Sequence, residues 1–193
     1  MRTVWGYDVS ESIDPIVSES DFHKMTGNAY SGNQHVGAAL AAASQAIRNY
    51  CGWHITPSVD CTAYPAGGTT VMRLPAGYVS AIDTITENES VVTDYEWKRT
   101  GLIRRVCRPW SDTWDGIKVE YTAGYDEDAV PDLAEAVCSI ASGVLTVAVG
   151  VVQESADGVS ITYSSSANSV ASALTSNYAS ALEPYRVVNS HAT

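Results

Sequence analysis

The chain has 193 residues, of which 45% are apolar, and it carries 22 acidic against 11 basic side chains, for a formal net charge of −11. This length accommodates one domain with a substantial core, or a domain with arms, and the apolar fraction excludes disorder across the whole chain. The acidic surplus disfavours a tight grip on nucleic-acid backbones, which needs clustered Lys and Arg. It does not exclude a surface along which DNA passes.

The N-terminal segment, residues 1–32, is expected to form an arm, because it shows no sustained periodicity and contains turn-forming residues such as Pro15 and Gly27. A helix is predicted over 33–50, where apolar residues recur at helical spacing. These residues are Val36, Leu40, Ala43, Ile47 and Tyr50. Gly52 then follows as a signal for the helix end.

Between 61 and 125 the pattern changes to short runs of β-branched and aromatic residues, separated by turns that contain Pro or Gly. Such runs are typical of half-buried antiparallel strands. We expect strands over 70–74, 79–85, 91–97, 102–106 and 117–121. They would form a small sheet or a split barrel.

A second helix is predicted over 131–150. Pro131 suits the first helical turn, and Asp132 and Glu135 lie near the positive end of the helix dipole. Apolar residues occupy every face, which predicts a helix buried on all sides. Residues 136–152 carry no charge, but the Ser and Gly residues among them and the acidic flanks argue against a membrane span.

Residues 139–182 carry only two charged side chains, Glu154 and Asp157. A strand over 159–163 and a third helix over 169–183 are predicted there. One face of this helix consists of small Ser and Thr side chains, which suit contact with other protein rather than water. The residues predicted to lie in a subunit interface are therefore Ser172, Ser176 and Ser180.

Together these elements predict an α+β fold with a mainly α-helical core of three main helices and a small antiparallel β region. The domain organisation that follows is an arm over 1–32, a domain over 33–186 and a C-terminal tail over 187–193.

No pattern in the sequence points to catalysis. There is no GxSxG, GxGxxG or GxxxxGK[ST] motif. The cysteines lack the spacing of metal ligands and are expected to be free and mostly buried thiols; they are Cys51, Cys61, Cys107 and Cys138. We therefore expect no enzyme activity, no cofactor and no metal.

One positive cluster stands out, and it is accompanied by Trp97 and Trp110. Its members are Lys98, Arg99, Arg104, Arg105 and Arg108. Salt bridges to acidic residues of an adjacent subunit or partner are the favoured interpretation in so acidic a protein. Stacking and phosphate pairing with nucleic acid is the alternative.

Three stretches of the sequence, taken in order, resemble a known family. They are 47–57 (IRNYCGWHITP), then 117–125 (IKVEYTAGY) with 130–137 (VPDLAEAV), and finally 158–163 (GVSITY) leading to the LEPYR ending at 182–186. Over about 34–186, this combination resembles the head-tail connector, or adaptor, proteins of tailed bacteriophages.

The resemblance implies a ring, usually of twelve copies, in the virion neck below the portal, assembled in the host cytoplasm. In that family the C-terminal segment docks on the portal, which points by position to Pro184, Tyr185, Arg186, Val187 and Val188. Other implied partners are the stopper or another neck or tail protein, and double-stranded DNA passing through the bore. The alternatives are another virion protein, for tail completion or decoration, and a glycan-binding module.

Overall fold

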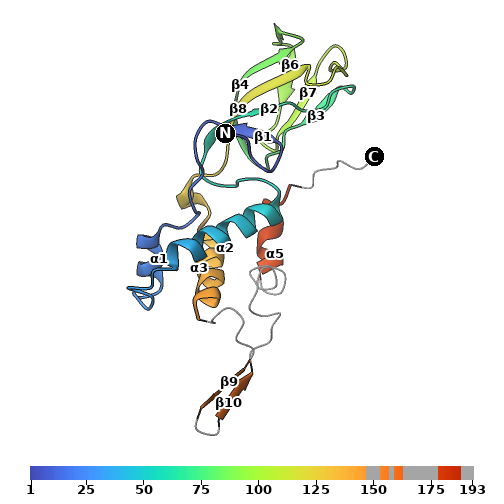
Figure 1. Ribbon diagram of the computed structural model, residues 1–193. Coiled ribbons are helices and arrows are strands. Elements are labelled where there is room, and N and C mark those ends of the chain that lie inside the picture. Colours follow the sequence, from blue (N-terminus) through green and yellow to red (C-terminus); the bar gives the residue numbers. More distant parts are fainter. Residues whose placement is uncertain (147–152, 157–158, 163–177, 188–193) are drawn as a thin grey trace. The chain divides into compact units, whose positions relative to one another are not determined.

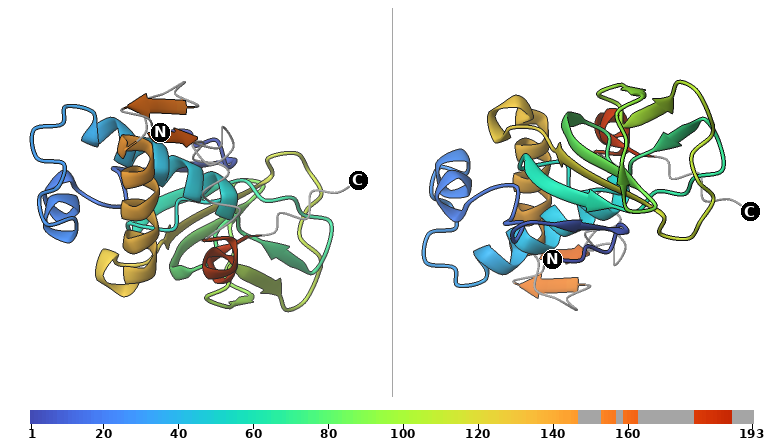
Figure 2. Two further views of the ribbon diagram at one scale, coloured as in Figure 1. Left: turned by 90° about the horizontal axis from the view of Figure 1, so that it is seen from below. Right: turned by 90° about the horizontal axis from the view of Figure 1, so that it is seen from above.

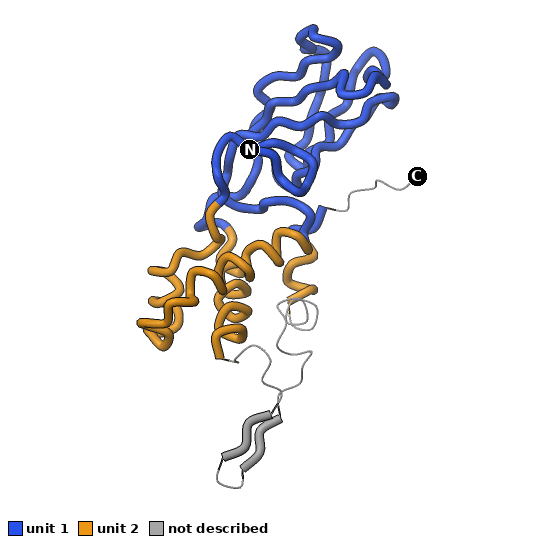
Figure 3. Tube along the Cα trace, in the orientation of Figure 1, with its two compact units in different colours: residues 1–13, 51–129, 185–193 blue, residues 14–50, 130–184 orange. Residues whose placement is uncertain are grey.

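The computed structural model describes residues 1–146, 153–156, 159–162 and 178–187 (Figure 1). The chain forms two compact units, which are distinguished by colour in Figure 3. Unit 1 comprises residues 1–13, 51–129 and 185–193, and unit 2 comprises residues 14–50 and 130–184. Segments that are far apart in the sequence thus come together in each unit.

Unit 1 contains an antiparallel sheet with the strand order β1-β2-β8-β4-β5. The strands are β1 (Tyr7–Val9), β2 (Val59–Ala63), β8 (Ile117–Ala123), β4 (Val79–Glu87) and β5 (Ser90–Val91). Burial alternates along the central strand β8, where Val119 and Tyr121 are buried and Lys118 and Glu120 are half-buried. The sheet therefore has an apolar inner face and a polar outer face.

A second antiparallel sheet of unit 1 consists of β3 (Val71–Arg73), β7 (Leu102–Arg105) and β6 (Tyr95–Trp97), with β7 in the centre. The register places Met72 opposite Ile103, and both side chains are buried. Arg105 also lies on this inner face, and its guanidinium is 2.7 Å from the carboxylate of Glu87 on the inner face of β4. The inner faces of the two sheets therefore meet.

His54, which is fully buried, ties the edge of the larger sheet to its centre. Its Nδ1 accepts a hydrogen bond from the hydroxyl of Tyr7 on β1 (2.7 Å), and its backbone N–H donates to the same hydroxyl (3.0 Å). Nε2 lies 3.0 Å from the carbonyl oxygen of Ala123 on β8. Because a carbonyl only accepts, this arrangement requires the tautomer with its proton on Nε2.

Unit 2 is built on α2 (Val36–Cys51, whose last residue is assigned to unit 1) and α3 (Pro131–Thr146), with α1 (Glu19–Met25) beside them. Figure 2 shows α3 crossing α2. The buried Phe22 of α1 packs near Tyr30, with 5.5 Å between the ring centroids. Arg48 of α2 is buried and donates to the carbonyl oxygen of Asp14 (2.8 Å), which fixes the segment before α1.

The helix α3 is buried on one side rather than all round. Its buried side is formed by Leu133, Ala136, Val137, Cys138, Ile140 and Ala141. Glu135, Ser139, Gly143 and Thr146 are exposed and recur at helical spacing. Small and polar residues at these positions form a solvent-facing stripe, although the mean composition of the helix is apolar.

The remaining described elements are the paired strands β9 (Gln153–Ala156) and β10 (Val159–Thr162), the short helix α5 (Ala179–Leu182), and the 3-10 turns η1 (Glu127–Ala129) and η3 (Glu183–Tyr185). Most of the helix predicted over 169–183 lies outside the described residues. The proposed division into an arm, a central domain and a tail stays a prediction.

The prediction of a mainly α-helical core is wrong. In the described part of the chain, four α-helices, of which two exceed seven residues, stand beside ten strands, and the larger sheet alone has five strands. The expectation missed β1, which lies in the supposed arm and has only three residues. Three residues are too few for their alternation to be recognised as a strand, and the partner β2 lies some fifty residues away in the sequence. The fold is α+β with a sizeable sheet.

Candidate interaction surfaces

The predicted subunit-interface residues belong to the helix that the sequence predicts over 169–183. Ser180 is exposed within α5. Ser172 and Ser176 lie outside the described residues, so the proposed Ser face stays a prediction.

The predicted portal-docking segment is anchored on unit 1. The indole Nε1–H of the buried Trp53 donates to the carbonyl oxygen of Tyr185 (2.6 Å), and the N–H of Val187 donates to the carbonyl oxygen of Cys51 (2.8 Å). Val187 is buried, Pro184 and Arg186 are exposed, and Val188 lies outside the described residues. Only some of the five predicted residues are thus available for a partner in this arrangement.

A cluster of aromatic side chains supports this segment. The cluster was not predicted from the sequence. The ring of Tyr185 meets Tyr125 edge-on (5.7 Å between centroids), and Tyr125 stacks on Tyr78 (4.6 Å). Arg99 donates to the hydroxyl of Tyr78 (2.9 Å). Burial and the neighbouring Tyr78 raise the pKa of Tyr125. The sequence signal for such a cluster is its 11 Tyr and 5 Trp residues against a single Phe. This composition does not indicate which rings meet.

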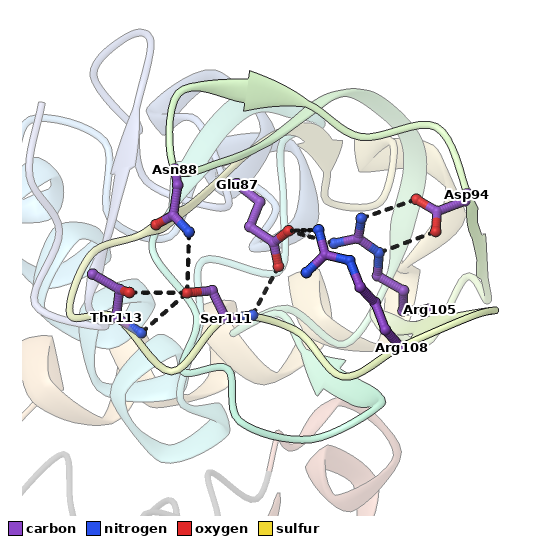
Figure 4. A network of polar contacts seen from close by, with 7 residues as sticks. All are labelled: Glu87, Asn88, Asp94, Arg105, Arg108, Ser111 and Thr113. Atoms are coloured by element: carbon purple, nitrogen blue, oxygen red, sulfur yellow. Dashed lines mark hydrogen bonds and ion pairs between the residues drawn. The ribbon is translucent and has the colours of Figure 1, made fainter.

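The basic cluster is largely neutralised by acidic residues of the same chain. Arg105 contacts Glu87 (2.7 Å) and Asp94 (3.1 Å), and Arg108 contacts Glu87 (2.6 Å), as Figure 4 shows. Arg104 pairs with Glu96 on the surface. The favoured interpretation, salt bridges to another subunit or partner, is therefore wrong for these three arginines.

Glu87 is the centre of this network, and its side chain is only 3% exposed. One carboxylate oxygen accepts from both guanidinium groups, and the other accepts from the backbone N–H of Ser111 (2.7 Å). Burial alone would raise the pKa of Glu87, but these hydrogen bonds outweigh it, and the pKa lies below its usual value. The carboxylate is thus held ionised between the two sheets and the following loop.

The loop over 106–116 is fixed at its base and exposed at its tip. The hydroxyl of Ser111 donates to Thr113 (2.9 Å) and accepts from the side-chain amide of Asn88 (3.3 Å) (Figure 4). Gly67 packs so closely on the carbonyl of Ser111 that a Cβ there would overlap it. The side chain of Trp114, by contrast, is 95% exposed.

An indole in water on a fixed loop is typical of an anchor for a binding partner. No contact was predicted for Trp114 from the sequence. The sequence does contain a signal for one, because Trp114 stands among polar turn residues in the stretch Ser111 to Gly116, which separates two strands.

Among the described residues, no group of three or more His, Cys, Asp or Glu side chains is arranged to hold a metal ion. None of the described helices is long and apolar enough to cross a membrane. All four cysteines are free, and Cys107 is the exposed one.

The chain is similar to proteins of phage-like particle necks. The sequence model of a family described as head completion protein (HCP) matches residues 15–188. A chain in the neck of a native GTA particle with C12 symmetry has a similar structure, with a TM-score of 0.62, 15% identity, and coverage of 94% of this chain and 95% of that one. A chain in the neck of an empty GTA particle with C6 symmetry gives a TM-score of 0.59, 17% identity and the same coverage. No curated protein matches the sequence.

Proposed function

The chain belongs to the head completion protein family, and on this premise we propose that it is a head-to-tail adaptor of the virion neck. The resemblance to head-tail connector proteins is thereby confirmed. As such an adaptor, the protein joins the portal vertex of the capsid to the neck and tail and lets DNA pass. The observation that carries this function is the family match, which covers the chain from residue 15 to residue 188.

A ring, in our proposal of twelve copies, is the working form of the protein. The support is the similarity in fold, over 94% of this chain, to a component of a neck with C12 symmetry. A ring of identical subunits requires two different, mutually complementary surfaces on each copy.

Contact with the portal is assigned to the segment from Pro184 to Val188. Its anchorage by Trp53 and Cys51 holds the backbone in place while leaving the side chains of Pro184 and Arg186 exposed. A preorganised segment loses less conformational entropy when it binds.

Contact with the next neck component, a stopper or tail protein, is assigned to the loop that carries Trp114. Its base is fixed by Ser111 and Glu87, and its tip exposes the indole. Tryptophan is enriched among the residues that dominate binding energy at protein interfaces.

Passage of DNA requires that the wall of the bore does not hold phosphate groups. The net charge of −11 suits this task, because a wall with clustered cations would bind and slow the duplex. We propose that some of the surplus carboxylates face the bore, and that the protein acts by assembly rather than by catalysis.

Mass measurement of the purified protein with and without portal rings tests this function. The expected result is a ring, either of the protein alone or assembled only on the portal. A strict monomer that ignores portal rings would contradict the adaptor function. A monomer that binds glycans with saturation would favour a glycan-binding module instead.

A further inference from the structure

The outer face of the three-stranded sheet is positively charged, in a protein that is negatively charged as a whole. The register places Val71, Arg104 and Glu96 in one row across the strands, and Arg73 and Leu102 lie opposite each other in the next. Lys98 continues the second row, since its N–H donates to the carbonyl of Leu102 (2.9 Å). The face thus presents three cations against one carboxylate. A groove of about 430 Å³ is lined by two of these cations, Lys98 and Arg104, together with Val71, Trp97 and Leu102.

Two of these cations have no acidic partner among the described residues. Arg104 pairs with Glu96 on the surface, whereas Arg73 and Lys98 are exposed and form no ion pair within the described part of the chain. The face therefore combines apolar side chains with uncompensated positive charge. This is the composition of a surface that binds an acidic protein partner.

The outer face of the five-stranded sheet carries the opposite charge. One row across its strands is formed by Asp8, Thr62, Glu120 and Thr84, and Asp60 lies in the next row opposite Thr122. A groove of about 300 Å³ is lined by Asp8, Asp60, Asp83 and Glu120. Two cations lie near this face. Lys118 pairs with Glu120 at 2.7 Å, and Arg2 lies opposite Asp8 across a β-bridge, so the four carboxylates remain in excess.

These two faces point away from each other, because the inner faces of the sheets meet at the buried contact between Glu87 and Arg105. Unit 1 is thus positive on one side and negative on the other. When the positive side of one copy contacts the negative side of the next, the charges of the two faces compensate each other. The same contact can repeat from copy to copy. Such a head-to-tail contact closes into a ring when its rotation closes.

We propose that the outer face of the three-stranded sheet docks on the outer face of the five-stranded sheet of a second copy of this chain. The proposal rests on the ring that the proposed function requires, and it names the surfaces that form it. A second copy fits better than DNA, because Glu96 and the apolar groove interrupt the cations. Only a few cations are present, too few for a strong grip on phosphates.

Charge reversal of each face tests the proposal. The basic-face variant carries Arg73→Glu and Lys98→Glu, and the acidic-face variant carries Asp60→Lys and Asp83→Lys. All four side chains are exposed and belong to no ion pair within the described residues. The control, Asp112→Lys with Asp115→Lys, makes the same change of charge as the acidic-face variant, but on the loop outside both faces. Circular dichroism and the thermal midpoint verify that each variant is folded.

Native mass measurement, with portal rings present if the wild type requires them, gives the readout. Each face variant alone is expected to need at least about tenfold more protein to assemble, because like charges then meet at every contact. A 1:1 mixture of the two variants is expected to form rings of alternating copies, since the reversed faces complement each other. The control is expected to assemble as the wild type does.

Rings that form equally well from both face variants would overturn the proposal while leaving the adaptor function intact. The proposal would also be overturned if the basic-face variant lost DNA binding but still formed rings. A wild-type protein that forms no ring with or without the portal would overturn the proposed function, and this proposal with it.

Discussion

The carboxylate of Glu87 lies 2.7 Å from the guanidinium of Arg105, between the two sheets of unit 1, with the side chains only 3% and 6% exposed. The guanidinium in turn lies over the ring of the buried Trp110, 4.9 Å from its centroid. A buried pair of this kind adds little net stability compared with apolar residues of the same size, but removal of one partner leaves the other charge buried and unpaired. This relationship joins β4, β7 and the loop that presents Trp114.

The substitution Glu87→Gln is expected to destabilise the protein by up to about 3–5 kcal/mol, because the buried Arg105 then keeps only the half-buried Asp94 as an acidic partner. Urea unfolding followed by tryptophan fluorescence measures the free energy of unfolding. The matched control is Glu96→Gln, which removes the exposed pair with Arg104 and is expected to cost less than about 1 kcal/mol. Equal costs for the two variants would show that the buried network does not hold unit 1 together.

The contribution of Glu87 is also expected to depend on pH. Because the folded state lowers the pKa of Glu87 below its usual 4.5, the ionised carboxylate stabilises the folded state fully above pH 4.5. This stabilisation is lost as the pH falls through the lowered pKa. The difference in unfolding free energy between the wild type and Glu87→Gln should therefore shrink in acid. A difference that stays constant below pH 4.5 would contradict this account.

The substitution Trp114→Ala is expected to leave the free energy of unfolding unchanged, because the indole is 95% exposed. It is expected to weaken binding of the next neck component by at least about tenfold, as removal of an interface tryptophan commonly does. Surface plasmon resonance with that component, on assembled rings, measures the affinity.

The comparison variant for Trp114 is Trp110→Ala, at the buried end of the same loop. It is expected to cost about 3–5 kcal/mol of stability, because it creates a cavity beneath Arg105. Unchanged binding in a stable Trp114→Ala variant would remove the loop from the proposed contact.

The substitution Trp53→Phe is expected to loosen the C-terminal segment. It keeps an aromatic ring but removes the N–H that donates to the carbonyl of Tyr185, at a cost of about 1 kcal/mol. Limited digestion with trypsin, followed by mass measurement of the fragments, should show faster cleavage after Arg186 than in the wild type. Cleavage at the wild-type rate would indicate that this hydrogen bond does not hold the segment.

Parts of the fold that depend on local pattern were predictable from the sequence. The spacing of Val36, Leu40 and Ile47 predicted a helix where α2 is found, and Pro131 marks the first residue of α3. The run of β-branched and aromatic residues over 117–121 predicted a strand where β8 is found. These signals lie within a few residues of one another, so one sequence carries them.

Features that depend on distant segments were not predictable. Glu87 and Arg105 are in different strands of different sheets, and no pattern indicates that they meet. The three-residue strand β1 depends on its pairing with β2 and on the hydrogen bond from Tyr7 to His54. For the same reason, Arg104, Arg105 and Arg108 were predicted to form salt bridges with another subunit or partner. Their acidic partners are in the same unit.

The most direct test of the proposed function is a cryo-EM reconstruction of the virion neck. The account predicts a symmetric ring of this chain between the portal and the tail. The C-terminal segment of each copy should lie against the portal, and the three-stranded sheet of each copy should contact the five-stranded sheet of the next copy. Density for this chain on the capsid surface, or at the far end of the tail, would contradict the account and favour a decoration or tail-completion protein.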